Sequence, residues 1–303
     1  MVKFTYFLID TFLKLSRKLF RGTGIQLLPF VTSFYKDLMK YRTSGQGENF
    51  KVIFRDSAFL CQPGDITILP TLMDGTFEKI ELDIFENILL ENPASTVFID
   101  VGANIGIWSI LAAEAMAESS TVFAFEPDQN NLKRLLDNVS INELRNVTVV
   151  PKAVGKDGQI QFSMAEFGGV SSISLQGNRN SVLVDSVKLD TFFKSLKFAS
   201  ENVIIKIDVE GFEPTVLRGS LELIFSKKPI LFIEIDFNEN RRQLDDWGDL
   251  MKKLFSTYNS AYLVSAGQCS SVTSQDIPRI SELNVLSTLI FSPQKLAGVE
   301  VSI

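Results

Sequence analysis

From residue 95 onward the chain alternates short apolar runs with amphipathic segments, and this alternation constrains the fold more than any other feature. Short apolar runs are typical of buried strands, and the segments between them have the period of helices. Such alternation predicts an α/β fold with a doubly wound, mostly parallel sheet. The expected strands are 95–100, 121–127, 146–155, 202–211 and 229–236, and the expected helices are 107–116, 129–141, 189–197 and 212–225.

Two parts of the chain depart from this alternation. Residues 259–267 and 284–293 have strand patterns with no helix pattern between them, so we expect an antiparallel C-terminal hairpin at the sheet edge. Residues 50–69 alternate apolar and polar side chains around two turn signals, which predicts a short hairpin before the sheet.

Between this first hairpin and the sheet, we expect a helix that ends at Pro93. It carries Glu78, Glu81, Ile84 and Leu89. The patterns therefore predict three segments. These are an N-terminal amphipathic helical extension, a hairpin and helix that lead into the fold, and the sheet domain, at residues 1–45, 46–92 and 93–303.

The N-terminal extension has apolar residues on one helical arc and basic residues on another. The apolar residues are Phe4, Leu8, Phe12, Leu15 and Leu19, and the basic residues are Lys14, Arg17, Lys18 and Arg21. Charges interrupt every apolar run before the roughly 20 residues that a bilayer span needs. Two alternatives stay open for this helix: packing on its own domain or on a second copy in a homodimer, and peripheral contact with a membrane.

The composition excludes several classes of function. The 303 residues include 36 acidic and 30 basic side chains, and the net charge of −6 argues against a nucleic-acid partner because phosphates need a basic surface. Cys61 and Cys269 are too few for a disulfide framework or a cysteine metal cluster, so we expect a cytoplasmic location. The chain has no histidine, which excludes histidine mechanisms and leaves other residue types as the general base.

The most informative local pattern is VFIDVGANIG at residues 97–106. A β-rich run ends at Asp100, and a turn with Gly102, Asn104 and Gly106 leads into a helical pattern. Helix N-termini have unpaired N–H groups and partial positive charge, so they suit an anionic group or the polar edge of a nucleotide. The pattern therefore predicts a nucleotide cofactor at this turn.

The type of nucleotide follows from the residues around the turn. Glu126 ends the next expected strand, 24 positions after Gly102, where it can accept hydrogen bonds from ribose hydroxyls. A dinucleotide fingerprint needs glycine where Asn104 and Ile107 stand, and Asp100 would repel phosphate. S-adenosylmethionine has no phosphate, and Asp100 can orient its ammonium while turn amides meet its carboxylate. The structural alternative is that Asp100 caps the helix and Glu126 is a solvated strand end.

These motifs resemble the FkbM family of S-adenosylmethionine-dependent methyltransferases. The matching blocks are FIDVGANIGIWS, AFEPDQNNLKRLLDNVSIN, VVPKAVG, VDSVKLDTFF, IIKIDVEGFEPTVLRGS and PILFIEID, and the resemblance covers roughly residues 73–240. It implies a Rossmann-like methyltransferase fold and O-methylation, often of hydroxyls on sugars or natural products. It also implies the cofactor-binding residues: Asp100, Gly102, Ala103, Asn104, Gly106, Glu126 and Pro127, with Ala153 near the adenine and Glu78 near the cofactor.

A second acidic pattern, KIDVEGFE at residues 206–213, follows the fourth expected strand. Acids after a strand usually form a solvated loop, but this strand end faces the cofactor, so we expect catalytic or substrate contact. Without histidine, Asp208 is the first candidate for the base or acceptor anchor, Glu210 is the second, and Lys206 is weaker.

The same edge of the sheet offers a candidate metal site. Glu234 and Asp236 end the next strand and would join Asp208 around a divalent cation, since carboxylate oxygens suit Mg²⁺. Several related chemistries need no metal, so a cation is possible but not favoured.

Three functions from different classes stay open. The leading one is methyl transfer from S-adenosylmethionine to the hydroxyl of a small-molecule or glycan acceptor. The alternatives are a nicotinamide-dependent oxidoreductase on a Rossmann fold and a non-catalytic module that its N-terminal helix recruits to a membrane or complex. The sequence does not distinguish a sugar acceptor from another hydroxyl compound.

Overall fold

The computed structural model describes residues 50–62, 65, 68–91, 95–163, 181–196, 202–236, 244–283, 285–296 and 299, all in a compact unit that spans Glu48–Ile303. The expected N-terminal helix and Pro93 lie outside the described residues. The division into three segments therefore stays a prediction. Within the described residues, no helix is long and apolar enough to cross a membrane.

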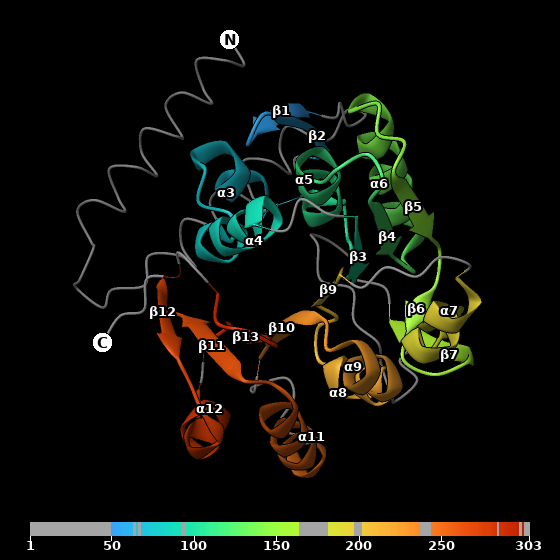
Figure 1. The fold of residues 1–303 in the computed structure, drawn as a ribbon. Coiled ribbons are helices and arrows are strands. Elements are labelled where there is room, and N and C mark those ends of the chain that lie inside the picture. Colours follow the sequence, from blue (N-terminus) through green and yellow to red (C-terminus); the bar gives the residue numbers. More distant parts are fainter. Residues whose placement is uncertain are drawn as a thin grey trace. The chain divides into compact units, whose positions relative to one another are not determined.

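The largest sheet among the described residues has eight strands (Figure 1). In spatial order they are β12 (Gln268–Ser271), β11 (Ser260–Ser265), β13 (Ser287–Ser292), β10 (Ile230–Ile235), β9 (Asn202–Ile207), β3 (Thr96–Val101), β4 (Thr121–Phe125) and β5 (Val147–Val150). The strands from β10 to β5 are parallel, which confirms the predicted doubly wound sheet.

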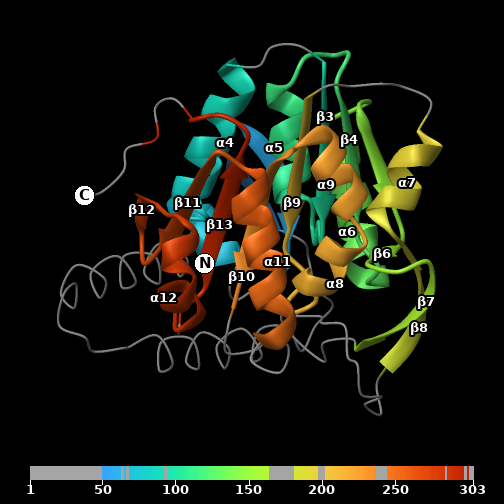
Figure 2. The same ribbon diagram turned by 60° about the horizontal axis from the view of Figure 1, so that its bottom comes forward.

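Side chains alternate between the two faces of this sheet, and each face has its own apolar core. In β3, Val97, Ile99 and Val101 belong to one core and Phe98 belongs to the other. Figures 1 and 2 show the helices in two groups on opposite faces. The first core includes α8 (Glu213–Arg218), α9 (Leu221–Lys227) and α11 (Leu244–Thr257), and the second includes α4 (Lys79–Glu91) and α5 (Ile107–Ala115). Because apolar residues fill both faces, the polar side chains gather at the carboxyl ends of the strands.

The helices predicted between the strands are confirmed, with one break. α5, α6 (Gln129–Ile141) and α7 (Leu189–Ser195) lie within their predicted ranges. Asp128 caps α6 by accepting hydrogen bonds from two backbone N–H groups of its first turn. The predicted helix 212–225 is instead two helices, α8 and α9, with a break at Gly219 and Ser220, where the chain packs tightly. A Cβ there would lie 2.3 Å from the carbonyl oxygen of Gly155.

The predicted strand 146–155 is wrong in its second half. Pro151 follows β5 and has no N–H to donate, so the ladder ends there. Ala153–Val154 form β6 in a separate sheet with β7 (Gly158–Ser163) and β8 (Ser181–Val187), in the order β6-β8-β7. The sequence pattern did not predict this sheet, because its pairings form between segments outside the strand-helix alternation.

The C-terminal pair of strands is confirmed as antiparallel, but its surroundings differ from the prediction. β13 pairs with both β10 and β11, and the edge strand is β12, which was not predicted. Ala266 and Gly267 have φ angles of 49° and 76°, the conformation of a tight two-residue hairpin turn, so β11 continues directly into β12. A short helix, α12 (Ile277–Ser281), lies between β11 and β13, contrary to the expectation of no helix there. α11 was also not predicted.

The first hairpin is confirmed over a shorter range. β1 (Phe50–Phe54) and β2 (Ser57–Cys61) pair antiparallel, and the next helix, α3 (Ile68–Asp74), begins inside the range predicted as hairpin. The hairpin is tied to α6, because the side-chain oxygens of Asn138 and Asn142 accept hydrogen bonds from Leu60 N–H and Ala58 N–H at 2.7 and 2.8 Å. The predicted helix before the sheet is α4; it begins one residue after Glu78.

Candidate active site

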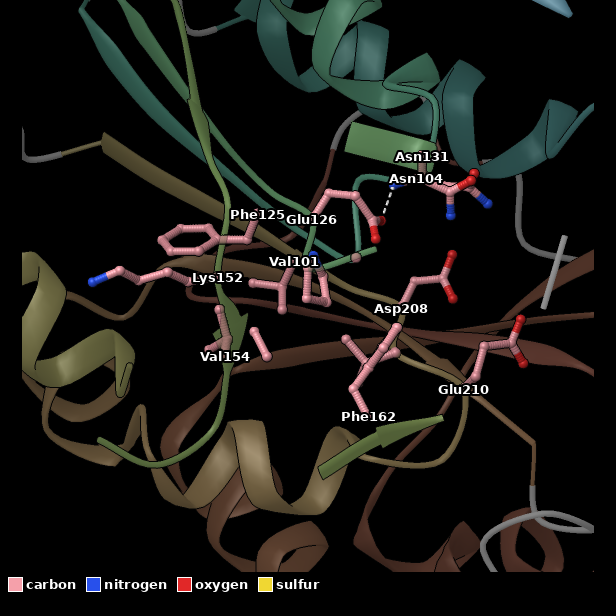
Figure 3. A pocket seen from close by; sticks show the side chains of 14 residues that line it. Val101, Asn104, Phe125, Glu126, Asn131, Lys152, Val154, Phe162, Asp208 and Glu210 are labelled. Atoms are coloured by element: carbon pink, nitrogen blue, oxygen red, sulfur yellow. Dashed lines mark hydrogen bonds between the residues drawn. The ribbon is translucent and has the colours of Figure 1, made fainter. Parts of the chain in front are cut away.

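A pocket opens at the carboxyl ends of β3, β4 and β9 (Figure 3). The segment from β5 through β7 closes another side of it. The described residues that line it are Val101, Gly102, Asn104, Phe125, Glu126, Pro127, Asn131, Lys152, Ala153, Val154, Phe162, Asp208, Val209 and Glu210. This position is where ligands of open α/β sheets bind.

The turn between β3 and α5 forms one wall of the pocket, and its shape depends on glycine. Gly102 has a φ of +84°, and a Cβ there would lie 1.8 Å from the backbone oxygen of Asp208. Gly106 has a φ of +91°, and a Cβ there would lie 2.3 Å from Leu135 Cδ1. The turn can therefore approach both β9 and α6 only because these side chains are absent.

Much of the backbone of this turn is already hydrogen-bonded within the chain. Gly102 N–H and Ala103 N–H both donate to the carbonyl oxygen of Phe125, and Gly106 N–H donates to the Ala103 carbonyl. Asn104 N–H donates to Glu126. The expectation that the amides of this turn meet a cofactor carboxylate therefore does not hold for these four groups.

Asp100 lies under the turn at the end of β3 and is 1% exposed. Its Oδ2 accepts a hydrogen bond from Ser109 Oγ at 2.6 Å, whereas its buried Oδ1 has no partner among the described residues. Burial raises the pKa of Asp100, although Lys206 and the Ser109 hydrogen bond oppose that rise. Ser109 lies inside α5, and the N-cap residue Gly106 makes no side-chain cap bond. Asp100 therefore bonds to the first turn of α5, as the capping alternative expected, and its Oδ1 is a buried acceptor with no partner among the described residues.

Glu126, at the end of β4, is buried rather than solvated, with 5% of its surface exposed. Its Oε2 accepts a hydrogen bond from Asn104 N–H, and its Oε1 accepts one from Asp128 N–H, both at 2.8 Å. Burial raises the pKa of Glu126 to about 8, against the effect of these two hydrogen bonds. Each carboxylate oxygen has a further lone pair, so Glu126 can hold the turn and still accept hydrogen bonds from a ligand in the pocket.

The acidic turn after β9 forms the opposite wall. Asp208, Val209 and Glu210 line the pocket, and Glu210 has a left-handed φ of 52°. Glu213 does not belong to the lining; it is buried at 2% exposure, and its Oε1 accepts hydrogen bonds from Val209 N–H at 3.2 Å and Gly211 N–H at 3.0 Å. Burial raises the pKa of Glu213 to about 7. Glu213 therefore shapes the turn that presents the two pocket carboxylates.

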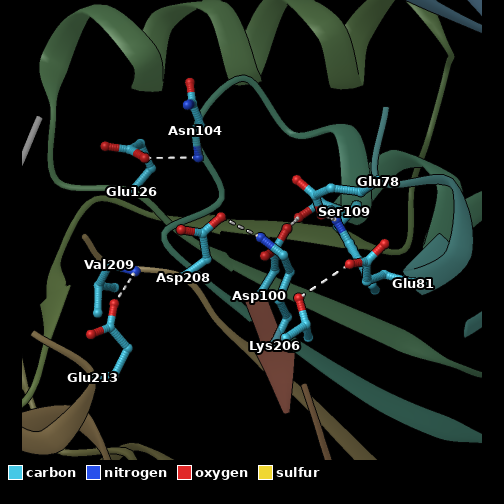
Figure 4. A network of polar contacts seen from close by, with 12 residues as sticks. Glu78, Glu81, Asp100, Asn104, Ser109, Glu126, Lys206, Asp208, Val209 and Glu213 are labelled. Carbon is cyan, nitrogen blue, oxygen red and sulfur yellow. Dashed lines mark hydrogen bonds and ion pairs between the residues drawn. The ribbon is translucent and has the colours of Figure 1, made fainter. Parts of the chain in front are cut away.

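Lys206 lies behind Asp208 in a buried cluster of charges (Figure 4). Its Nζ donates to Asp208 Oδ2 at 2.7 Å and lies 5.4 Å from the centroid of the Trp108 ring. Burial would lower the pKa of Lys206, but the carboxylates of Asp208, Glu78, Asp100 and Glu234 raise it well above its usual value. Lys206 is therefore the counter-ion of several acids at once.

Glu78 belongs to the same cluster, just before α4. Trp108 Nε1 donates to Glu78 Oε2 at 2.6 Å, and Glu78 has a left-handed φ of 37°. Burial raises the pKa of Glu78 to about 7, whereas the pKa of Asp208 is lowered because Lys206 outweighs its burial. A strained backbone at a buried carboxylate is typical of functional positions.

The structure does not bring the candidate metal ligands together as a metal site. Within the described ranges, no group of three or more His, Cys, Asp or Glu side chains is placed to hold a metal ion. Glu234 forms a hydrogen bond with Asp208, and burial raises its pKa well above the usual value. The Lys206 ammonium supplies positive charge to Asp208 where the prediction would place a cation.

Most of the predicted site residues meet in one pocket. Gly102, Asn104, Glu126, Pro127, Ala153, Asp208 and Glu210 line it. Four others, Asp100, Ala103, Gly106 and Glu78, are outside the described lining and support it from the turn or the charged cluster. Sequence reasoning missed Asn131, Lys152 and Phe162. Asn131 lies in the first turn of the helix after Glu126, and Lys152 adjoins Ala153, so their positions were available as signals; Phe162 belongs to the second sheet and had none.

The fold and the pocket together define a Rossmann-like methyltransferase. The chain belongs to the FkbM methyltransferase family, because the family model described as the methyltransferase FkbM domain matches residues 100–262, more than half of the chain. This match confirms the resemblance of the motifs and opposes the nicotinamide-dependent alternative. No curated protein matched the chain in sequence.

Solved structures are similar to the chain at a lower level. A methyltransferase FkbM from Methylobacillus flagellatus KT is 20% identical, with a TM-score of 0.41, over 65% of this chain and 43% of that one. A SAM-dependent methyltransferase from Agrobacterium tumefaciens is 9% identical, with a TM-score of 0.46, over 82% and 72% of the two chains. An O-methyltransferase from Bacillus cereus is 12% identical, with a TM-score of 0.39, over 70% and 81%. These scores are too low for any of the three to support a functional argument.

Proposed function

We propose that this chain transfers a methyl group from S-adenosylmethionine to the hydroxyl of a small-molecule or glycan acceptor. The observation that carries the proposal is the pairing of two buried acids at neighbouring strand ends. Asp100 has an oxygen without a partner among the described residues, and Glu126 faces the pocket from the adjacent strand. Membership of a methyltransferase family supports the same reaction class.

The residues present fit the proposed cofactor. Asp100 Oδ1 would accept a hydrogen bond from the cofactor ammonium, directly or through water, because a buried acceptor without a partner is costly. Glu126 would accept from the ribose hydroxyls, and Ala153, beside Phe125 and Val154, would lie near the adenine. When bound, the cofactor supplies an electrophilic methyl group on a positively charged sulfur.

The acids of the second turn would act on the acceptor. Its hydroxyl must lose a proton during transfer, and a base works best when its pKa lies near the working pH. Asp208 has a lowered pKa and stays charged, so we assign it the role of an anchor that accepts the hydrogen bond of the hydroxyl. Glu210 lines the pocket beside Asp208, so it is the candidate that takes the proton; Glu78 has a pKa of about 7 but lies outside the described lining.

Isothermal titration calorimetry with S-adenosylhomocysteine and with NAD tests the cofactor assignment. We expect binding of S-adenosylhomocysteine and none of NAD. The reverse result would overturn the proposal, and it would support the oxidoreductase alternative.

The acceptor class is tested with S-adenosylmethionine labelled on its methyl group. Neutral sugars, amino sugars and hydroxylated polyketides form the panel. Base-stable label excludes a methyl ester, and such label on a neutral sugar, which has no amine, indicates an ether. Binding of the cofactor without transfer to any member of a broad panel would favour the recruited, non-catalytic module. A peripheral membrane or homodimer role of residues 1–45 remains a separate prediction.

A further inference from the structure

One ammonium group serves a cluster of carboxylates directly behind the pocket. In the sheet register Lys206 is opposite Asp100 on β3 and Phe232 on β10, so its side chain projects from the central strands toward α4 and α5. Its side chain is 8% exposed, and its Nζ contacts Asp208, which lines the pocket. The other acids that face it are Asp100 on β3, Glu78 before α4, Glu81 on α4 and Glu234 on β10.

The acids in this cluster outnumber the bases. Five carboxyl groups face one ammonium group, so the net charge behind the pocket is negative once two of the acids are ionised. A buried charge is screened much less by salt and water than a surface charge. The affinity of the pocket for a charged ligand therefore depends on whether Lys206 is present.

The proposed cofactor changes its charge during the reaction. When the methyl group leaves, the electron pair of the broken carbon–sulfur bond stays on the sulfur, and the positive sulfonium becomes a neutral thioether. The acceptor oxygen gains the methyl group and loses its proton. S-adenosylmethionine and S-adenosylhomocysteine therefore differ by one positive charge and one methyl group, and a negative wall binds the first more tightly than the second.

We propose that Lys206 limits this preference, so that the charged cofactor and its uncharged product bind with more similar affinity than the carboxylates alone would allow. The inference rests on the proposed function, because it assumes this cofactor. Lys206 acts through Asp208 and the neighbouring acids, so it is a positioning residue rather than a catalytic one. Its effect would lower the affinity for the charged cofactor and leave the affinity for the uncharged product nearly unchanged.

The test measures the ratio of the dissociation constants of S-adenosylhomocysteine and S-adenosylmethionine by calorimetry at pH 8. Lys206→Gln removes the charge and keeps a donor for Asp208, and we expect the ratio to rise about fivefold or more. Asp208→Asn removes a negative charge, and we expect the ratio to fall. The double variant should return toward the parent value. Lys194→Met is the matched control, because Lys194 is an exposed lysine on α7 that pairs with Glu222.

Each outcome decides the proposal. A rise in Lys206→Gln and a fall in Asp208→Asn, with Lys194→Met unchanged, support it. An unchanged ratio in a folded Lys206→Gln, or a shift equal to that of Lys194→Met, overturns it. If Lys206→Gln does not fold, the double variant Lys206→Arg with Asp208→Asn takes its place. It keeps the positive charge and removes one negative charge, so the ratio must fall below the parent value. If the parent protein binds neither molecule, the proposed function fails as well; if it binds both and charge changes leave the ratio constant, only this inference fails.

Discussion

The two turns that wall the pocket, at residues 102–106 and 208–211, follow neighbouring parallel strands and are held in similar ways. Next to each turn, a buried glutamate holds the backbone in place by accepting hydrogen bonds from backbone N–H groups. Glu126 accepts from Asn104 and Asp128, and Glu213 accepts from Val209 and Gly211. The chemistry that the two turns present differs. The first turn presents glycine backbone and an asparagine, whereas the second presents the carboxylates of Asp208 and Glu210.

The two turns therefore meet different requirements of the site: close packing at the first turn and charge at the second. The first turn is constrained by space, because Gly102 lies against the backbone of Asp208. The second turn is constrained by charge, because Lys206 holds Asp208 ionised. The two glutamates also differ: Glu126 accepts from Asn104 and Asp128 on two different oxygens, whereas Glu213 accepts from Val209 and Gly211 on the same oxygen, Oε1.

The largest effect is expected for Gly102→Ala. A Cβ at 1.8 Å from a backbone oxygen forces the two turns apart, and φ is +84°. We expect a loss of about 3–5 kcal/mol in the free energy of unfolding, measured by chemical denaturation. Gly158→Ala is the control, since φ there is +109° but no described atom lies within 4 Å of the added Cβ. It should cost only about 1 kcal/mol, from backbone strain. Equal losses in the two variants would show that the contact between the turns is unimportant.

The stability of the protein should fall as the pH rises from about 5 to 8, because both glutamates have raised pKa values in the folded state, about 8 for Glu126 and about 7 for Glu213. In this range the folded state binds protons that the unfolded state has lost, so the ionised form opposes folding. We expect a total fall of about 4–6 kcal/mol from these two groups, measured by denaturation curves at several pH values. Glu126→Gln should flatten the profile, and a rise of stability over this range would contradict the assignment.

At pH 6 Glu126 is a neutral carboxyl group, and each of its two oxygens can still accept a hydrogen bond. An amide has one acceptor oxygen for two N–H groups, so Glu126→Gln should cost about 1–3 kcal/mol. The same variant should weaken the binding of S-adenosylhomocysteine, since the first turn loses its fastening. Thermal denaturation and calorimetry measure the two effects. Unchanged affinity in the variant would remove Glu126 from the proposed ribose site.

The smallest effect is expected for Glu213→Gln. The amide oxygen of glutamine can take the place of Oε1 and accept both N–H groups, so we expect a smaller loss than in the alanine variant. Glu213→Ala removes the acceptor and should cost about 1–3 kcal/mol. Hydrogen exchange of the Val209 and Gly211 amides should rise in the alanine variant and stay unchanged in the glutamine variant. If glutamine and alanine behave alike, the charge of Glu213 matters rather than its acceptor oxygen.

The sequence predicted those parts of the structure that depend on neighbouring residues. Strands β3, β4, β9 and β10 followed from apolar runs, and α6 followed from its periodicity, since local patterns determine both. The same patterns placed Gly102, Glu126 and Asp208 at strand ends, and parallel strands bring their carboxyl ends to one edge. Seven predicted residues therefore line one pocket.

Features that depend on contacts between distant segments were decided by the tertiary structure alone. The sheet of β6, β8 and β7, and with it the place of Phe162 in the pocket, arises from pairings that local pattern does not encode. The hydrogen bonds of the turn amides, and the lack of a partner for Asp100 Oδ1 among the described residues, also depend on which segments meet. Acidity was decided in the same way: Asp208 and Glu78 have similar side chains, but burial and the distance to Lys206 move their pKa values in opposite directions.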